Sequence, residues 1–157
     1  MDDDALLRHA IDLAAAARAR GDHPFGALLA DASGDVILTA QNSVGTDDDP
    51  TAHAETNLVR AAGRRFTSAE RRSMTLYTST EPCAMCAGAI YWASIPTVVF
   101  ALSEAELRSM TGDDPKNPSL DLPCREVFAR GAHPTAVRGP FDIPAAREVH
   151  AGFWRTS

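Results

Sequence analysis

The sequence of 157 residues has few cysteines, almost no lysine and no long apolar run. A helix that spans a bilayer needs about 20 consecutive apolar residues, so we expect no membrane association. The acidic start, Met1-Asp2-Asp3-Asp4, lacks the basic and apolar regions of a secretory signal peptide. Without these signals, the expectation is a soluble chain that stays in the cytoplasm.

Cysteine is scarce: the chain has Cys83, Cys86 and Cys124. An odd and small number of cysteines is not typical of a secreted disulfide scaffold. Two of them form a C-x-x-C motif, which indicates a metal-binding or redox pair. We interpret Cys124 as a small buried residue, with a position near the substrate as the alternative.

Basic residues are outnumbered by acidic ones. Asp plus Glu total 21 against 15 Lys plus Arg, which gives a net charge of −6, and Lys116 is the one lysine. Proteins that bind polyanions normally have a basic excess or a basic stripe on their surface. We interpret the pairs Arg64-Arg65 and Arg71-Arg72 as a solvated face, so nucleic acid is not the expected partner.

The composition, with 45% hydrophobic and 23% charged residues, is that of an ordinary globular protein. The length predicts one domain over residues 1–157. Strands that alternate with helices after an opening β-hairpin imply an α/β sheet covered on both faces. The expected helices are 5–20, 53–62, 83–93, 103–110, 125–130 and 145–154, the expected strands are 25–30, 36–40, 74–80, 97–100 and 135–138, and the expected loops are 45–50 and 111–123.

Two short motifs carry the chemistry, and each is expected at the start of a helix. The first contains His53 and Glu55, and the second contains Pro82, Cys83 and Cys86. A helix N-terminus favours thiolates over thiols because its free N–H groups and dipole are positive there. One imidazole nitrogen and two thiolates are three suitable ligands for Zn²⁺, and the fourth tetrahedral position stays open for water, as a catalytic site requires.

Glu55 lies two residues beyond His53 and can point at a zinc-bound water without binding the metal. Zinc lowers the pKa of such a water from about 16 to about 7. Glu55 can then accept its proton and return it to a ring nitrogen and to departing ammonia. The combination H-x-E with P-C-x-x-C is the signature of zinc nucleobase deaminases.

Other interpretations of these residues are open. Cys83 and Cys86 could form a thioredoxin-like redox pair, although this leaves His53 and Glu55 unexplained. They could also hold a structural zinc, although a fourth protein ligand is then missing. The remaining histidines lack partner spacing and are interpreted as ordinary surface or structural residues: His9, His23, His133 and His150.

Residues 49–55 and 76–90 resemble segments shared by bacterial guanine deaminases and tRNA adenosine deaminases of the cytidine deaminase-like superfamily. The resemblance covers residues 5–102 well and fades beyond them. It implies a three-layer α/β/α sandwich with a central mixed sheet, one zinc per subunit and usually a homodimer. It also implies His53, Cys83 and Cys86 as zinc ligands and Glu55 as the proton shuttle.

Further residues are assigned by this resemblance. The segment around Phe25 resembles the guanine deaminase branch, where Phe25 would be an aromatic wall for a flat base; strand core is the alternative. Asn42 would bind the substrate through its side-chain amide, or else shape the turn with Ser43. The backbone N–H of Ala54 would face the base. Trp92 would line the pocket or, as we favour, pack in a dimer.

The region after about residue 110 matches this pattern less well. Asp114 is a possible counterpart of an aspartate that assists proton transfer in guanine deaminases, and a solvated loop is the alternative. Residues 111–157 are expected to close the pocket over a core of residues 1–110. Phe153 and Trp154 could do so by stacking on the base, or could anchor the last helix.

The sequence thus predicts a zinc-dependent hydrolytic deaminase of a free aminated nucleobase or nucleoside, with a guanine-like purine favoured. Editing of adenosine in tRNA and deamination of a cytosine-type pyrimidine or triazine are the alternatives. A zinc-binding module without activity is a further one, and the presence of Glu55 argues against it.

Overall fold

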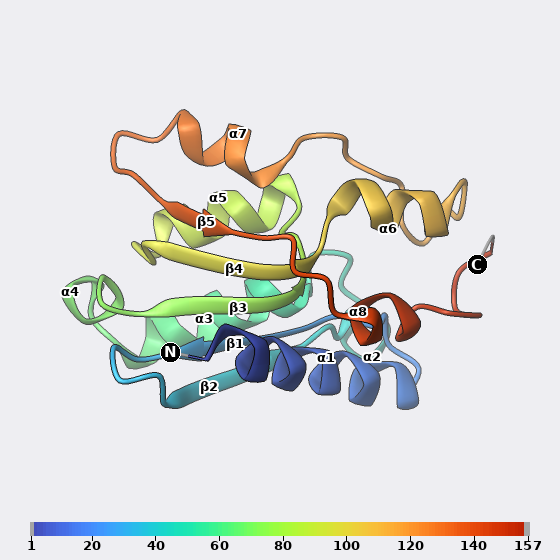
Figure 1. The fold of residues 1–157 in the computed structure, drawn as a ribbon, viewed down its shortest axis with the longest axis horizontal. Coiled ribbons are helices and arrows are strands. Elements are labelled where there is room, and N and C mark those ends of the chain that lie inside the picture. Colours follow the sequence, from blue (N-terminus) through green and yellow to red (C-terminus); the bar gives the residue numbers. More distant parts are fainter. Residues whose placement is uncertain (1, 156–157) are drawn as a thin grey trace.

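The computed structural model describes residues 2–155, which form a central sheet with helices on both faces (Figure 1). The strands are β1 (Gly26–Ala30), β2 (Val36–Gln41), β3 (Thr75–Thr80), β4 (Thr97–Leu102) and β5 (Ala136–Arg138). The helices are α1 (Asp3–Ala19), α2 (Val44–Asp47), α3 (Ala54–Arg65), α4 (Ser68–Arg71), α5 (Ala84–Trp92), α6 (Glu104–Thr111), α7 (Cys124–Ala129) and α8 (Pro144–Glu148).

The sheet has five strands in the order β2-β1-β3-β4-β5. β1 is antiparallel to both β2 and β3, which confirms the predicted hairpin, whereas β4 is parallel to both β3 and β5. The sheet is therefore mixed, as expected. Because β3 and β4 are parallel, their carboxyl ends meet at the same edge, where ligands commonly bind in α/β proteins.

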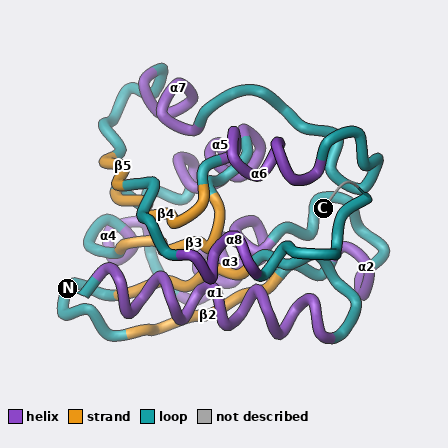
Figure 2. Tube along the Cα trace, turned by 45° about the vertical axis from the view of Figure 1, so that its right-hand side comes forward, coloured by secondary structure: helices purple, strands orange, loops and turns teal. Residues whose placement is uncertain are grey.

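Alternating side chains of the strands build a separate core on each face of the sheet. Leu28 and Tyr77 pack with residues of α1 and α8, whereas Leu29 and Leu76 pack with residues of α3 and α5. Figures 1 and 2 show these helices on opposite faces, so the three-layer sandwich is confirmed. Gly26 allows α1 to lie close to β1, because an added Cβ would lie 2.4 Å from the Ala10 carbonyl oxygen.

Two sequence expectations about secondary structure are wrong. The loop expected at 45–50 contains most of a short helix, α2, which ends at Asp47. The last helix ends at Glu148 instead of reaching residue 154, and the chain continues in turns. Gly152 adopts a φ of +73°, a left-handed conformation that interrupts a right-handed helix.

The arginine pairs are also not a uniform solvated face. The guanidinium of Arg71 is half-buried and donates hydrogen bonds to the carbonyl oxygens of Phe66 and Ala93. These carbonyls lie just after α3 and α5, so Arg71 joins the ends of the two helices that carry the candidate zinc motifs. Within residues 2–155, no helix has both the length and the apolar character required to cross a membrane.

Candidate active site

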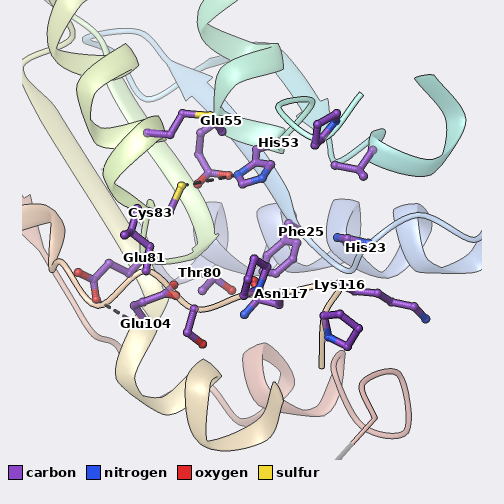
Figure 3. A pocket seen from close by; sticks show the side chains of 17 residues that line it. His23, Phe25, His53, Glu55, Thr80, Glu81, Cys83, Glu104, Lys116 and Asn117 are labelled. Atoms are coloured by element: carbon purple, nitrogen blue, oxygen red, sulfur yellow. Dashed lines mark hydrogen bonds between the residues drawn. The ribbon is translucent and has the colours of Figure 1, made fainter. Parts of the chain in front are cut away.

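The two motifs meet at one end of the sheet because each stands at the start of a helix. His53 is the N-cap residue of α3, and Cys83 is the N-cap residue of α5. Both have extended backbone conformations, which turn the chain from the preceding segment into the helix. Figure 3 shows the side chains of His53, Glu55 and Cys83 grouped at one side of a cavity.

The ligand atoms of His53, Cys83 and Cys86 lie within 4.8 Å of one another. His53 Nδ1 is 3.7 Å from Cys83 Sγ and 3.5 Å from Cys86 Sγ. A tetrahedral zinc with ordinary Zn–N and Zn–S bond lengths separates such atoms by about 3.6 Å. The three residues therefore fit a single zinc ion.

The electrostatics of the cysteine pair favour metal binding. Hydrogen bonding from the Cys86 thiol, followed by that from His53, lowers the pKa of Cys83 to about 4. The same bond and burial raise the pKa of Cys86. Cys83 is thus a thiolate near neutral pH, whereas Cys86 must lose its proton when the metal binds. Metal affinity therefore depends on pH.

Glu55 is positioned to exchange protons beside the metal ligands. It is buried in the first turn of α3 and lines the cavity. Burial, and next the negative charge of Cys83, raise the pKa of Glu55 to about 7. A carboxyl group with a pKa near neutrality can both accept and return a proton at physiological pH.

The cavity has a volume of about 390 Å³, which lies within the range of small-molecule sites. The loop after α6 contributes Lys116 and Asn117 to its wall (Figure 3), and Ser119 as well. The full lining is His23, Phe25, Val44, Pro50, His53, Glu55, Thr80, Glu81, Cys83, Met85, Glu104, Pro115, Lys116, Asn117, Pro118, Ser119 and Leu120.

The three predicted substrate-binding residues do not all line the cavity. Phe25 lines the cavity. Asn42 and Ala54 are buried, and neither is among the described residues that line the cavity. The Asn42 side-chain oxygen accepts the N–H of Val44, so part of its hydrogen-bonding capacity shapes the turn before α2.

Asp114 lies outside the described lining of the cavity. Its carboxylate is buried, with Oδ1 accepting the N–H of Lys116 at 2.9 Å and Oδ2 accepting the N–H of Arg155 at 2.6 Å. Figures 1 and 2 show the segment after α8 returning to the loop after α6. Asp114 therefore joins the loop over the cavity to the C-terminal segment, and its predicted part in proton transfer stays a prediction.

The C-terminal aromatic residues pack behind the wall of the cavity. The Trp154 ring centre lies 6.0 Å from that of Phe25 and 5.4 Å from that of His23, and Trp154 is 3% exposed. The Trp154 indole N–H donates to Nδ1 of the buried His150. Phe153 and Trp154 thus support lining residues of the same chain and are not among the described residues that line the cavity.

Several lining residues were not predicted. His23 was interpreted as an ordinary surface or structural residue, and Thr80, Glu104 and Ser119 were not singled out, yet all four face the cavity. Thr80 and Glu104 follow from topology, because Thr80 ends β3 and Glu104 comes two residues after the end of its parallel neighbour β4. The short apolar runs that predict these strands could have pointed to them once the parallel pairing was known.

The remaining cysteine is structural. Cys124 is fully buried in the core beside α5, as predicted, and its N–H donates to Glu81 Oε2 at 2.9 Å. The other oxygen of Glu81 accepts the N–H of Glu104 at 3.0 Å. Glu81 therefore holds the starts of α6 and α7 against the end of β3.

Known proteins share the motifs and the fold. Residues 1–102 match the model of the cytidine and deoxycytidylate deaminase zinc-binding region. A probable cytosine deaminase from Schizosaccharomyces pombe is 41% identical over 150 residues, which cover 96% of this chain and 91% of the relative. A guanine deaminase from Bacillus subtilis is 38% identical over 73% of both chains, and a tRNA-specific adenosine deaminase from Haemophilus influenzae is 38% identical over 65% of this chain and 59% of the relative.

Solved structures agree with this grouping. The guanine deaminase from Nitrosomonas europaea has a TM-score of 0.76 at 26% identity, over 96% of this chain and 85% of that one. A similar mutant structure, also with a TM-score of 0.76 at 26% identity over 95% of this chain and 84% of that one, is a complex with 8-azaguanine. The predicted zinc and hydrolase chemistry fit these relatives, and the chain belongs to the zinc-binding cytidine and deoxycytidylate deaminase family.

Proposed function

We propose that this deaminase acts on a free aminated nucleobase, with a guanine-like purine as the first candidate. The observation that carries the proposal is the cavity of about 390 Å³, which has the metal ligands His53 and Cys83 together with Glu55 on one side and is also lined by a loop of the same chain. This volume suits a small heterocycle. Residues 115–120 form part of the cavity wall, so a base within a folded RNA would have to enter beside this loop.

In the proposed mechanism Glu55 moves the protons. Bound zinc would supply an activated water for attack on the ring carbon that carries the amine. The Glu55 carboxylate accepts a proton from the attacking water and delivers it to the neighbouring ring nitrogen. Glu55 then transfers the second proton to the amine, which leaves as ammonia while the ring carbon becomes a carbonyl.

Two observations support a purine. Phe25 offers an aromatic wall to a flat ring, and Trp154 packs against Phe25 from behind. The related complex with 8-azaguanine shows that a purine analogue fits a similar fold.

Cytosine is the second candidate because of the relative from Schizosaccharomyces pombe. Its similarity extends over 96% of this chain and so includes nearly all of the loop and C-terminal segment that surround the cavity. The guanine deaminase from Bacillus subtilis matches 73% of the chain. A cytosine-type pyrimidine or triazine therefore belongs in every substrate test. Adenosine in tRNA is disfavoured by the net charge of −6.

Ammonia release from the zinc-loaded protein tests the proposal. The panel contains guanine, isoguanine, adenine, cytosine, their nucleosides, amino-triazines and a tRNA anticodon stem–loop. We expect turnover of at least one free base, with guanine or cytosine the best substrate. No release from any free base, or inosine formation in the stem–loop alone, would contradict the proposal.

We also propose that the chain forms a homodimer. Trp92, at the end of α5, is 82% exposed in the single chain, an unusual exposure for so large an apolar side chain. Sedimentation equilibrium of the wild type should give twice the chain mass, and Trp92→Ala should shift the equilibrium toward monomer. The location of the protein in the cytoplasm stays a prediction.

A further inference from the structure

Three polar side chains of the cavity wall have no hydrogen-bond partner among the described residues 2–155. Among residues 2–155, the hydroxyl oxygens of Thr80 and Ser119 are buried without a hydrogen bond. The Glu104 carboxyl group is likewise without a hydrogen bond or ion pair in the described chain, although Glu104 is only 9% exposed. All three residues line the same cavity.

The sheet and its loops bring these side chains together. Thr80 is paired with Leu102 at the carboxyl ends of β3 and β4. Glu104 begins α6 two residues after Leu102, and its backbone N–H donates a hydrogen bond to the Glu81 carboxylate. In Figure 3, Thr80 and Glu104 lie across the cavity from His53 and Glu55. Ser119 lines the same cavity from the loop after α6.

A comparison of two neighbouring acids shows why Glu104 points to a ligand. Both oxygens of the buried Glu81 accept backbone N–H groups, from Glu104 and Cys124, so Glu81 is satisfied by the fold. Glu104 is similarly buried but has no such donors among residues 2–155. A buried polar group without a partner is destabilising, and a ligand that supplies hydrogen-bond donors removes this penalty.

We propose that Thr80, Glu104 and Ser119 form a subsite that binds the base at ring atoms outside the amidine group that reacts. In this subsite Glu104 accepts the ring N–H that a sugar replaces in nucleosides. This inference rests on the proposed function. A carboxyl group keeps an acceptor oxygen whether it is ionised or protonated, so the contact does not depend on its charge. The hydroxyl groups of Thr80 and Ser119 can donate to or accept from neighbouring atoms of the ring.

The subsite makes the enzyme selective for free bases. Free guanine carries a hydrogen on N9 and free cytosine carries one on N1, whereas the nucleosides carry the sugar at these atoms. A nucleoside therefore removes the donor and places a bulky group against Glu104. A pocket that hydrogen-bonds a substrate N–H discriminates strongly against an analogue that lacks it.

The test uses the best free base of the panel and its analogue methylated at that ring nitrogen. For the wild type, we expect kcat/KM on the methylated base to be about 10- to 100-fold lower than on the free base. Glu104→Leu removes the acceptor at similar size and should lower kcat/KM on the free base by a similar factor, mainly through KM. On the methylated base Glu104→Leu should cause almost no further loss, because the contact is already absent.

Two further variants distinguish loss of the Glu104 hydrogen bond from a general loss of folding or zinc. Glu104→Gln keeps a carbonyl acceptor and should recover most of the affinity lost in Glu104→Leu. Glu106→Gln changes an exposed acid on the same helix, which pairs with Arg147, and should leave kcat/KM within twofold of the wild type. Zinc content and Tm of each variant confirm that it is folded and loaded.

The outcomes distinguish the inference from the proposed function. If the wild type deaminates no free base, the proposed function fails. If the wild type is active but Glu104→Leu changes kcat/KM equally on the free and the methylated base, the subsite assignment is wrong. Loss in kcat alone with an unchanged KM would also contradict it. Thr80→Val and Ser119→Ala should each give a smaller loss, below about tenfold, on the free base.

Discussion

The two sides of the cavity are built in different ways. The zinc side takes its ligands and Glu55 from two short motifs, each at the N-terminus of one helix. The opposite side takes Thr80 from a strand end and Glu104 from the next helix, and a loop adds Ser119 to the cavity wall. The residues that would carry out the reaction therefore lie in two short stretches of sequence, whereas the residues proposed to select the substrate come from segments that are distant in sequence.

The largest expected effect lies on the zinc side, at Glu55. Glu55→Gln keeps the size of the side chain but cannot accept a proton, so kcat should fall by about 10²- to 10⁴-fold. Zinc content, measured by elemental analysis, should stay near one per chain because Glu55 is not among the ligand residues. A variant with kcat within tenfold of the wild type would refute the proposed proton transfer.

The next effect separates the ligand cysteines from the structural one. Cys83→Ser should reduce zinc content well below one per chain and lower the free energy of unfolding by about 4 kcal/mol, as expected when a tight ligand is lost. Cys124→Ala is the matched control, since Cys124 lies in the core away from the ligand cluster. It should retain the metal. Equal zinc loss in both variants would contradict the assigned ligand set.

A smaller effect concerns His150, which accepts the indole N–H of Trp154, the residue that packs behind Phe25. Burial, and next the charge of Arg18, lower the pKa of His150 to about 4, below its usual value of 6.5. Above pH 6.5 both folded and unfolded states hold the neutral ring, and this residue adds no pH dependence. Between 6.5 and 4 only the unfolded state binds the proton, so the free energy of unfolding falls as the pH is lowered.

Urea unfolding of the zinc-loaded protein at pH 7 and pH 5 measures this contribution. The His150 part of the loss at pH 5 should be about 2 kcal/mol. His150→Gln keeps an acceptor for the Trp154 indole N–H but cannot titrate, so its loss between these pH values should be smaller by that amount. Identical pH dependence in both proteins would show that His150 is protonated in the folded state.

The smallest effect decides between two roles of Asp114. If Asp114 only anchors the loop to the C-terminal segment, Asp114→Asn should cost about 1–2 kcal/mol of stability, because the amide nitrogen cannot accept one of the two N–H groups. The value of kcat should then fall less than tenfold. A fall of 100-fold or more at unchanged stability would instead support the predicted role in proton transfer.

Local patterns predicted much of the fold. The apolar spacing of α1, the turn between β1 and β2, and the cap at Ser103, whose side chain accepts the N–H of Glu106, all depend on residues close in sequence. The last helix was predicted too long because the apolar residues that suggested a helix continue beyond Glu148, where the structure has turns. Arg71 was missed because its partners, Phe66 and Ala93, come together only when α3 and α5 pack.

The sequence by itself determined the metal chemistry. The ligands and Glu55 occur within two contiguous motifs, and helix starts orient such residues through backbone geometry that the local chain specifies. Only the tertiary structure decided what faces the metal site. Parallel pairing of β3 with β4 sets Thr80 and Glu104 at one edge, and Asp114 joins residues 41 positions apart. Such contacts depend on the packing of distant segments, which no local pattern encodes.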